Sequence, residues 1–210
     1  MLNMGGIANF TFLSGTLDPR AVFVTDTGPG NTLIDAASRT YFQQEFDRDA
    51  SLARQGTVNP ALLAALKANA FFQTAFPRTT GPELLNLEYL HHAQALSHTT
   101  DCSPIDILAT LTRFSAETIT GAIRQILPGG STPCVIYMSG GGVHNPLLTE
   151  WIREGLPDIP MRFTDELGIS ADAKEAVLFA ILANEALVGE PIHFGKAGMP
   201  ATTMGKISFP

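Results

Sequence analysis

A glycine turn at residues 26–31 (DTGPGN) constrains the fold of this chain more than any other segment. An apolar run at 21–24 predicts a buried strand before it, and the helical spacing of apolar residues from Leu33 to Phe42 predicts a helix after it. Strand, turn and helix in this order are typical of an open α/β sheet, which binds ligands at such turns. The turn therefore predicts a ligand-facing edge that carries Asp26. The alternative is a tight turn in which Asp26 only caps the helix.

Two further glycine segments accompany strand patterns. Gly5 and Gly6 interrupt the strand pattern of residues 2–13, which indicates a bulge or a close approach of two backbones. A triple glycine at 140–142 follows the strand-like run 134–138. Such loops can offer free backbone amides to an anion or to the face of a nucleoside, as can the amides at the start of a helix. One loop alone could be a flexible turn, whereas several at strand ends predict a binding site.

Five motifs are spread along the chain, at 4–9, 26–31, 109–112, 140–146 and 172–176. Taken together, they resemble the anhydro-N-acetylmuramic acid kinase family. They occur in the family's order from the first residues to the last, and the motifs at 26–31 and 140–146 are the most specific. The resemblance covers the whole chain but only the C-terminal part of such an enzyme, which also has an N-terminal domain with another phosphate loop.

The resemblance implies the fold of the sugar kinase, actin and Hsp70 superfamily, in which two ribonuclease-H-like domains close on ATP. We expect an α/β fold: a ribonuclease-H-like (actin-like ATPase) domain with a mixed central sheet flanked by helices, forming the second half of a two-domain kinase. Residues 1–210 would be this C-terminal kinase domain, with the N-terminal phosphate-loop domain absent. Residues 47–100 would be a substrate-side insertion of helices and loops within it.

The resemblance also implies an activity: ATP-dependent phosphorylation of 1,6-anhydro-N-acetylmuramic acid with hydrolytic opening of the anhydro ring. The product is N-acetylmuramic acid 6-phosphate, in cell-wall (peptidoglycan) recycling. Asp26 suits the role of general base toward the water that attacks the anomeric carbon, while the released bridging oxygen attacks the γ-phosphate. The alternative is a noncatalytic truncated remnant or a nucleotide- or sugar-binding module of the same fold, since half of the phosphate cradle would be missing.

Binding residues follow from the same resemblance. The Gly5-Gly6 loop looks like a second phosphate loop and the triple glycine like an adenosine loop, with Mg²⁺ accompanying ATP and held mainly by phosphate oxygens and water. The expected ATP-binding residues are Gly5, Gly6, Asn9, Gly140, Gly141, Gly142 and Asn145. The expected sugar-binding residues are Thr27, Gly28, Thr80, Glu83 and Glu175.

Several of these residues have simpler interpretations. Glu175 could belong to the first turn of a helix that Ser170 caps, where acids complement the helix dipole. Lys174 is expected to be solvated rather than bound to phosphate. In the loop at 77–83, which leads into a predicted helix, Arg78 keeps a positive charge of the family's loop. Pro82 replaces a cation and removes a backbone donor, which puts sugar affinity or specificity in doubt.

Composition limits the partners. The formal net charge of −7 and the calculated pI of about 5.1 argue against nucleic acid as a partner, because the sequence has no basic cluster to neutralise a phosphate backbone. No export signal and no apolar run of membrane-spanning length is found. Cys102 and Cys134 form no metal-ligand pair, and Cys134 is expected to be a reduced, buried thiol. The spacing of His91, His92 and His98 is poor for a shared metal ion. We expect a cytoplasmic protein that binds ATP and an amino sugar, with a homodimer possible because family members often pair.

Periodicity predicts the order of elements. The safest helix runs over 104–127, with Ser103 as its cap, Pro104 in its first turn and Pro128-Gly129-Gly130 at its end. Strands are predicted near 3–13, 21–25, 134–138 and 160–164. Helices are predicted near 32–46, 60–69, 83–97, 104–127, 145–155 and 171–188.

Overall fold

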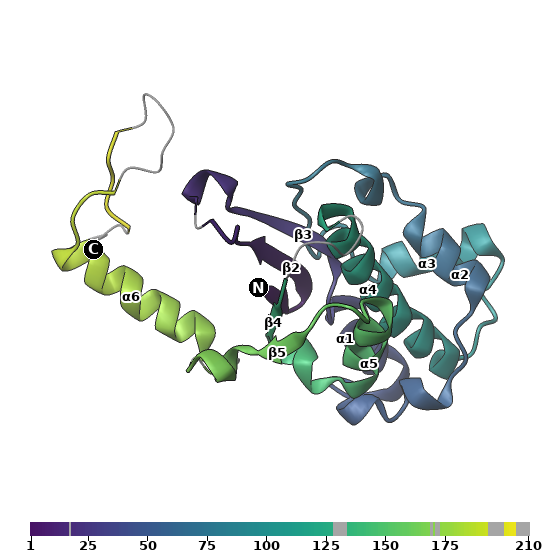
Figure 1. Cartoon of the computed structure of the whole chain (residues 1–210). Coiled ribbons are helices and arrows are strands. Elements are labelled where there is room, and N and C mark those ends of the chain that lie inside the picture. Colours follow the sequence, from purple (N-terminus) through teal and green to yellow (C-terminus); the bar gives the residue numbers. More distant parts are fainter. Residues whose placement is uncertain (17, 128–133, 169, 171–172, 193–199, 205–210) are drawn as a thin grey trace.

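The computed structural model describes residues 1–16, 18–127, 134–168, 170, 173–192 and 200–204. Its centre is a mixed five-stranded sheet in the order β3-β2-β1-β4-β5, in which β1, β2 and β3 are antiparallel and β1, β4 and β5 are parallel (Figure 1). The expected α/β fold with a mixed sheet flanked by helices is confirmed. The strands are β1 (Leu2–Met4), β2 (Ile7–Phe12), β3 (Phe23–Pro29), β4 (Ile136–Ser139) and β5 (Met161–Phe163).

One long helix organises the helical part. Ser103 caps α4 by accepting a hydrogen bond from the Asp106 amide, and Pro104 begins the helix, as its sequence predicts. The predicted stop at 128–130 lies outside the described residues. Helices α2 and α3 lie beyond α4, on the side away from the sheet (Figure 1). The helices are α1 (Thr32–Phe42), α2 (Pro60–Lys67), α3 (Leu87–Ser97), α4 (Pro104–Ile126), α5 (Pro146–Gly155) and α6 (Lys174–Val188).

The core has two parts that α4 joins. Its N-terminal half packs with α1, α2 and α3 around the fully buried Phe114, while its C-terminal half packs with α5 against one face of the sheet around Leu2 and Met138. Trp151 of α5 contacts both parts. Because one continuous helix forms part of both, the sheet edge and the helical segment 47–100 keep a fixed relation.

Two strand predictions were wrong in an informative way. Residues 3–13 are an antiparallel hairpin, in which Asn3 pairs with Asn9 and the Gly5-Gly6 pair is the turn. The expected bulge in one strand is therefore wrong, whereas the alternative, a close approach of two backbones, is confirmed at Gly30. Strand β3 continues to Pro29, so Asp26 lies inside the strand and not in the turn after it. The bulge occurs in β3, because Ala8 pairs with Gly28 while Asn9 pairs with Asp26.

Three helix ends also differ from the prediction. Helix α1 ends at Phe42, because Gln43 takes a left-handed conformation with φ of 56°. Helix α3 begins at Leu87 and not near 83, because the Asn86 side chain caps it through the Tyr89 amide. Helix α6 begins at Lys174 after Ala173, which offers no side-chain cap, so the proposed Ser170 cap is wrong.

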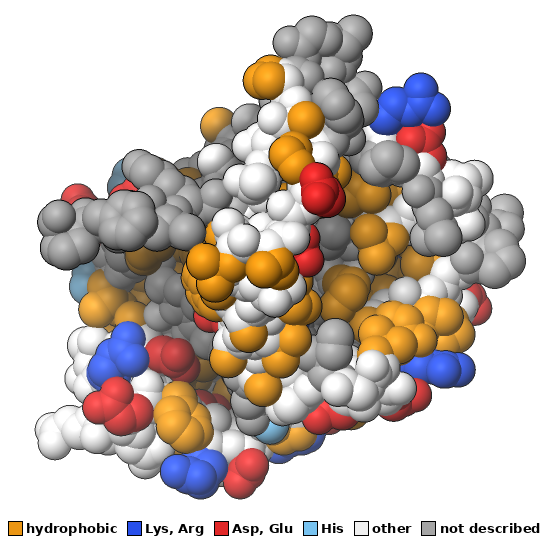
Figure 2. All heavy atoms as spheres, turned by 90° about the vertical axis from the view of Figure 1, so that its left-hand side faces the viewer, with side chains coloured by type: hydrophobic (Ala, Val, Ile, Leu, Met, Phe, Trp, Pro, Cys, Tyr) orange, Lys and Arg blue, Asp and Glu red, His pale blue; other side chains and the backbone are white. Residues whose placement is uncertain are grey.

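Helix α6 extends away from the rest of the described structure (Figure 1). None of its residues is buried, and its large apolar side chains include Phe179 at 67% and Val188 at 73% exposure. Figure 2 shows hydrophobic side chains gathered on this side of the molecule. The sheet face that α4 and α5 leave uncovered carries the side chain of Val24, which is 56% exposed.

Candidate functional site

The hairpin turn and the start of α1 are joined by backbone hydrogen bonds. The Gly30 and Thr32 amides donate to the Gly6 carbonyl at 2.8 and 3.0 Å, and the Asn31 amide donates to the Gly5 carbonyl at 2.9 Å. The expectation of free amides at the start of this helix is therefore wrong for these residues. By contrast, the amides of Gly5 and Gly6 donate to no backbone acceptor within the described ranges.

Close packing explains the glycines of the 26–31 motif. A Cβ on Gly30 would lie 2.1 Å from the Gly5 carbonyl oxygen, and a Cβ on Gly28 would lie 2.9 Å from the Thr118 Oγ1 of α4. Gly28 also has a φ of +150°. The Ser115 hydroxyl of α4 donates to the Gly30 carbonyl at 2.9 Å. These glycines thus let β3 and the start of α1 fit between the hairpin turn and α4.

The triple-glycine turn meets the hairpin turn at Met4. A Cβ on Gly140, whose φ is +84°, would lie 2.8 Å from the Met4 carbonyl oxygen, and a Cβ on Gly142 would lie 2.6 Å from the Met4 Cβ. The Asn31 side chain donates to the same carbonyl at 3.4 Å. All three glycine segments therefore converge at one edge of the sheet, as their positions after strands predict. The Asn145 side chain caps α5 through the Leu148 amide.

A cavity of about 480 Å³ lies beside this junction. The start of α1, segment 46–49 and the turn from Gly141 to Asn145 form its walls. Its size falls within the range of about 300–1,000 Å³ that is typical of small-molecule sites. Asp26 is not among its lining residues.

Asp26 lies at a second place, where the loop after α2 runs along β3. Its carboxylate Oδ2 accepts hydrogen bonds from the Thr79 hydroxyl at 2.9 Å and the Thr80 amide at 2.8 Å. Its backbone amide donates to the Arg78 carbonyl at 2.9 Å. No donor within the described part of the chain contacts Oδ1. One oxygen is thus held in position, while the other is open to a ligand.

Arg78 fixes this loop in a way that the sequence did not indicate. Its guanidinium donates to the carbonyls of Phe71 at 3.1 Å, Thr74 at 3.3 Å and Asp26 at 3.3 Å. The same group lies 4.6 Å from the ring centroid of Phe71 and 4.7 Å from that of Phe76. Burial lowers the pKa of Arg78. Three phenylalanines near one arginine in residues 71–78 were the available signal.

The expected sugar contacts divide into two groups. The Thr80 hydroxyl is buried without a hydrogen-bond partner in the described structure, and the Glu83 carboxylate lies over Gly81, where a Cβ would be 2.2 Å from its Oε2. These two residues therefore lie on the same loop that contacts Asp26. In contrast, the fully buried Thr27 hydroxyl donates to the Ala8 carbonyl at 3.1 Å, and Gly28 is buried against α4.

A row of polar side chains crosses the open face of the sheet. Asp26 pairs with Asn9, Asn9 with Asn3 and Asn3 with Ser139 on successive strands, so the four side chains share one face. The Lys174 ammonium donates to the Asn3 Oδ1 and the Ser139 Oγ, both at 2.8 Å. The prediction of a solvated Lys174 is therefore wrong, and burial lowers the pKa of its ammonium.

Glu175, the next residue of α6, does not join this row. It is exposed, and neither a hydrogen bond nor an ion pair connects it to Asp26 in the part of the chain that the structure describes. Asp172, three residues earlier in the sequence, lies outside the described residues.

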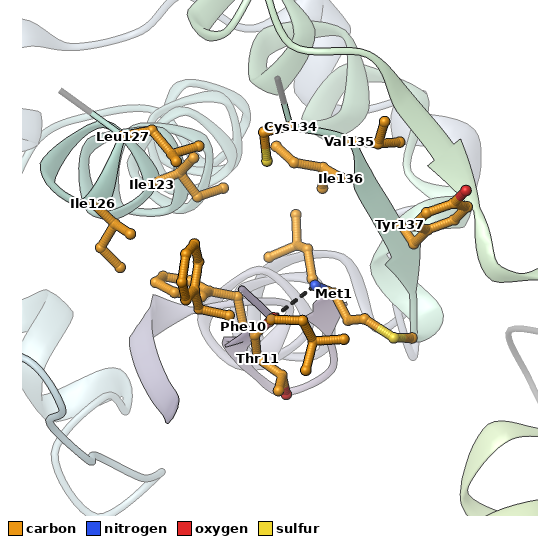
Figure 3. A pocket seen from close by; sticks show the side chains of 13 residues that line it. Met1, Phe10, Thr11, Ile123, Ile126, Leu127, Cys134, Val135, Ile136 and Tyr137 are labelled. Atoms are coloured by element: carbon orange, nitrogen blue, oxygen red, sulfur yellow. Dashed lines mark hydrogen bonds between the residues drawn. The ribbon is translucent and has the colours of Figure 1, made fainter. Parts of the chain in front are cut away.

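A smaller apolar cavity of about 220 Å³ lies at the opposite end of the sheet, below α4 (Figure 3). Phe10, Ile123 and Ile136 line it, and the Met1 amino group donates to the Thr11 carbonyl at 2.8 Å beside it. The half-exposed Cys134 also lines this cavity, so the prediction of a buried thiol is wrong. This cavity contains none of the predicted site residues.

The described residues contain no group of three or more His, Cys, Asp and Glu side chains arranged for a metal ion, and His91, His92 and His98 are exposed. None of the helices that the structure describes is long and apolar enough to cross a bilayer.

The fold and the site define an α/β protein in which glycine turns and a polar row meet at one edge of a mixed sheet. The chain belongs to the family described as anhydro-N-acetylmuramic acid kinase, whose sequence model matches residues 1–207. A kinase of this name from Pseudoalteromonas atlantica is 51% identical over 100% of the chain and 53% of the relative. Those from Streptomyces coelicolor and Vibrio cholerae are 39% and 37% identical, over 99% and 97% of the chain and 51% of each relative. The chain thus spans about half the length of these relatives.

Proposed function

We propose that this chain is the base-carrying half of a kinase that phosphorylates 1,6-anhydro-N-acetylmuramic acid. The overall reaction consumes the anhydro sugar, ATP and water and yields N-acetylmuramic acid 6-phosphate and ADP, in cytoplasmic peptidoglycan recycling. Membership of the family supports this proposal, and so does the mixed sheet, which suits a ribonuclease-H-like C-terminal domain.

The observation that carries the proposal is the geometry of Asp26. Two donors hold Oδ2, so Oδ1 is positioned to accept a proton from water. As that water attacks the anomeric carbon, the bond from this carbon to the bridging oxygen breaks. The bridging oxygen then attacks the γ-phosphorus, and the bond from this phosphorus to the ADP oxygen breaks. The proton from water goes to Asp26, and the buried Thr80 hydroxyl and Glu83 would contact the sugar.

ATP fits the glycine turns at the same edge of the sheet. The Gly5 and Gly6 amides are unbonded within the described backbone and could donate to phosphate oxygens. The turn from Gly140 to Gly142, with Asn145, would contact the nucleoside. Mg²⁺ would neutralise phosphate charge and would be held mainly by phosphate oxygens and water.

A binding module without turnover is the second candidate, because the chain spans only about half the length of its relatives. A single experiment distinguishes the two candidates. The chain is produced alone and also joined to the remaining half of the Pseudoalteromonas atlantica kinase, and ADP release is measured with and without the anhydro sugar.

We expect sugar-dependent ADP release from the joined protein and little from the chain alone. If the joined protein folds and binds ATP but releases no sugar-dependent ADP, this chain is a noncatalytic module. If the chain alone turns over as fast as the joined protein, the proposal that it is half of an active site is wrong.

A further inference from the structure

The cavity beside the triple-glycine turn has a feature that the proposed function does not use. Asp35, in the first turn of α1, lines this cavity, and its carboxylate makes no hydrogen bond or salt bridge with any described residue. Burial raises the pKa of its carboxyl group to about 6. Of the smaller effects, the charge of Arg39 lowers this pKa and the charge of Glu45 raises it. A half-buried carboxylate without a partner is costly unless something else donates to it.

The other charged side chains of the cavity differ from Asp35. The Asp47 carboxylate is already satisfied by the amides of Leu52 and Ala53, both at 2.9 Å. The guanidinium of Arg48 lies 5.2 Å from the ring centroid of Phe46, so the two form an exposed flat surface at the cavity wall. Asp49 also lines the cavity but is exposed to solvent, so Asp35 is the half-buried carboxylate of this cavity that remains available to a ligand.

The position of Asp35 along α1 indicates which part of a nucleotide it meets. Phosphates at the Gly5-Gly6 turn would lie at the start of α1, because Thr32 is bonded to that turn. Asp35 is three residues further on, about 4.5 Å along the axis at a rise of about 1.5 Å per residue. A carboxylate repels phosphate but accepts hydrogen bonds from hydroxyl groups. The sugar of a nucleotide is the hydroxyl-bearing group next to its phosphates.

We propose that Asp35 binds the ribose hydroxyls of ATP in this cavity and so selects ribonucleotides with free 2′ and 3′ hydroxyls. This inference rests on the proposed ATP-binding function. The cavity volume of about 480 Å³ leaves room for the base beyond the ribose, against the flat surface of Phe46 and Arg48.

The test compares two nucleotides with two proteins. ATP and 2′,3′-dideoxy-ATP are titrated into the chain and into its Asp35→Ala variant at a pH well above 6, and amide NMR shifts report even weak binding. A hydrogen bond to a charged group predicts that the chain binds ATP roughly tenfold more tightly than the dideoxy form. Asp35→Ala should bring this ratio close to one. Asp101→Ala, which removes an exposed carboxylate outside the cavity, should keep it.

The ratio is informative because loss of phosphate repulsion in Asp35→Ala affects both nucleotides equally. If the chain binds both nucleotides alike, or if Asp35→Ala keeps the full preference, the ribose assignment is wrong while the kinase proposal stands. If the chain binds neither nucleotide at millimolar concentration, the ribose assignment is wrong, whereas the kinase proposal is still decided by ADP release from the joined protein.

Discussion

Replacing Gly30 with alanine should weaken the fold, because this glycine lies against the hairpin turn. The new Cβ would be 2.1 Å from the Gly5 carbonyl oxygen and 3.3 Å from the Ala8 amide nitrogen, and both are backbone atoms that cannot rotate away. The turn and α1 must separate, which breaks the bonds of Gly30, Asn31 and Thr32 to the turn. At a net value of about 0.5–1.5 kcal/mol per hydrogen bond, we expect a loss of about 2–4 kcal/mol.

Gly121→Ala is the matched control within the same protein. A Cβ on Gly121 meets no atom within 4 Å, and the residue lies inside α4, where alanine is favoured over glycine by about 0.5–1 kcal/mol. Urea unfolding should therefore show opposite changes in the free energy of unfolding for the two variants, with similar m-values. Equal stability of Gly30→Ala and the unchanged chain would refute the close packing of the turn on α1.

Two further outcomes follow from charged groups. Arg78→Lys keeps the charge but not the planar set of donors, so we expect the variant to be less stable by about 2 kcal/mol. Hydrogen exchange at the Thr80 amide should become faster, and unchanged exchange would mean that Arg78 does not hold the loop. Because the pKa of Asp35 is raised from 3.8 to about 6 in the folded chain, folding favours its protonated form, and this stability is lost as pH rises through about 6. Asp35→Asn should remove that loss. As pH rises across this range, the free energy of unfolding of the variant should therefore increase relative to that of the unchanged chain; parallel curves would contradict the burial of this carboxylate.

Local signals were enough to predict much of the fold. The cap at Ser103, the proline after it and the apolar stripe all lie within one helix, so α4 was predicted correctly. The three glycine segments were correctly expected to meet, because each follows a strand and strand ends share an edge of the sheet.

The errors concern interactions between distant residues. Gly5 and Gly6 looked like a bulge because strand spacing is the same on both sides of a tight turn, and only pairing across β1 and β2 reveals the hairpin. The bonds of Lys174 to Asn3 and Ser139 join residues far apart in the sequence, so no local pattern could show them. The amides after Pro29 looked free because their acceptors lie in the hairpin.

The role of Asp26 is the central claim, and the rate of sugar-dependent ADP release tests it most directly. The measurement uses the chain joined to the remaining half of the Pseudoalteromonas atlantica kinase, with and without Asp26→Asn. Loss of a general base predicts a fall in kcat of about 10²–10⁴-fold, with ATP affinity unchanged because Asp26 lies outside the cavity beside the glycine turns. Turnover within a few-fold of the unchanged protein would show that another group accepts the proton.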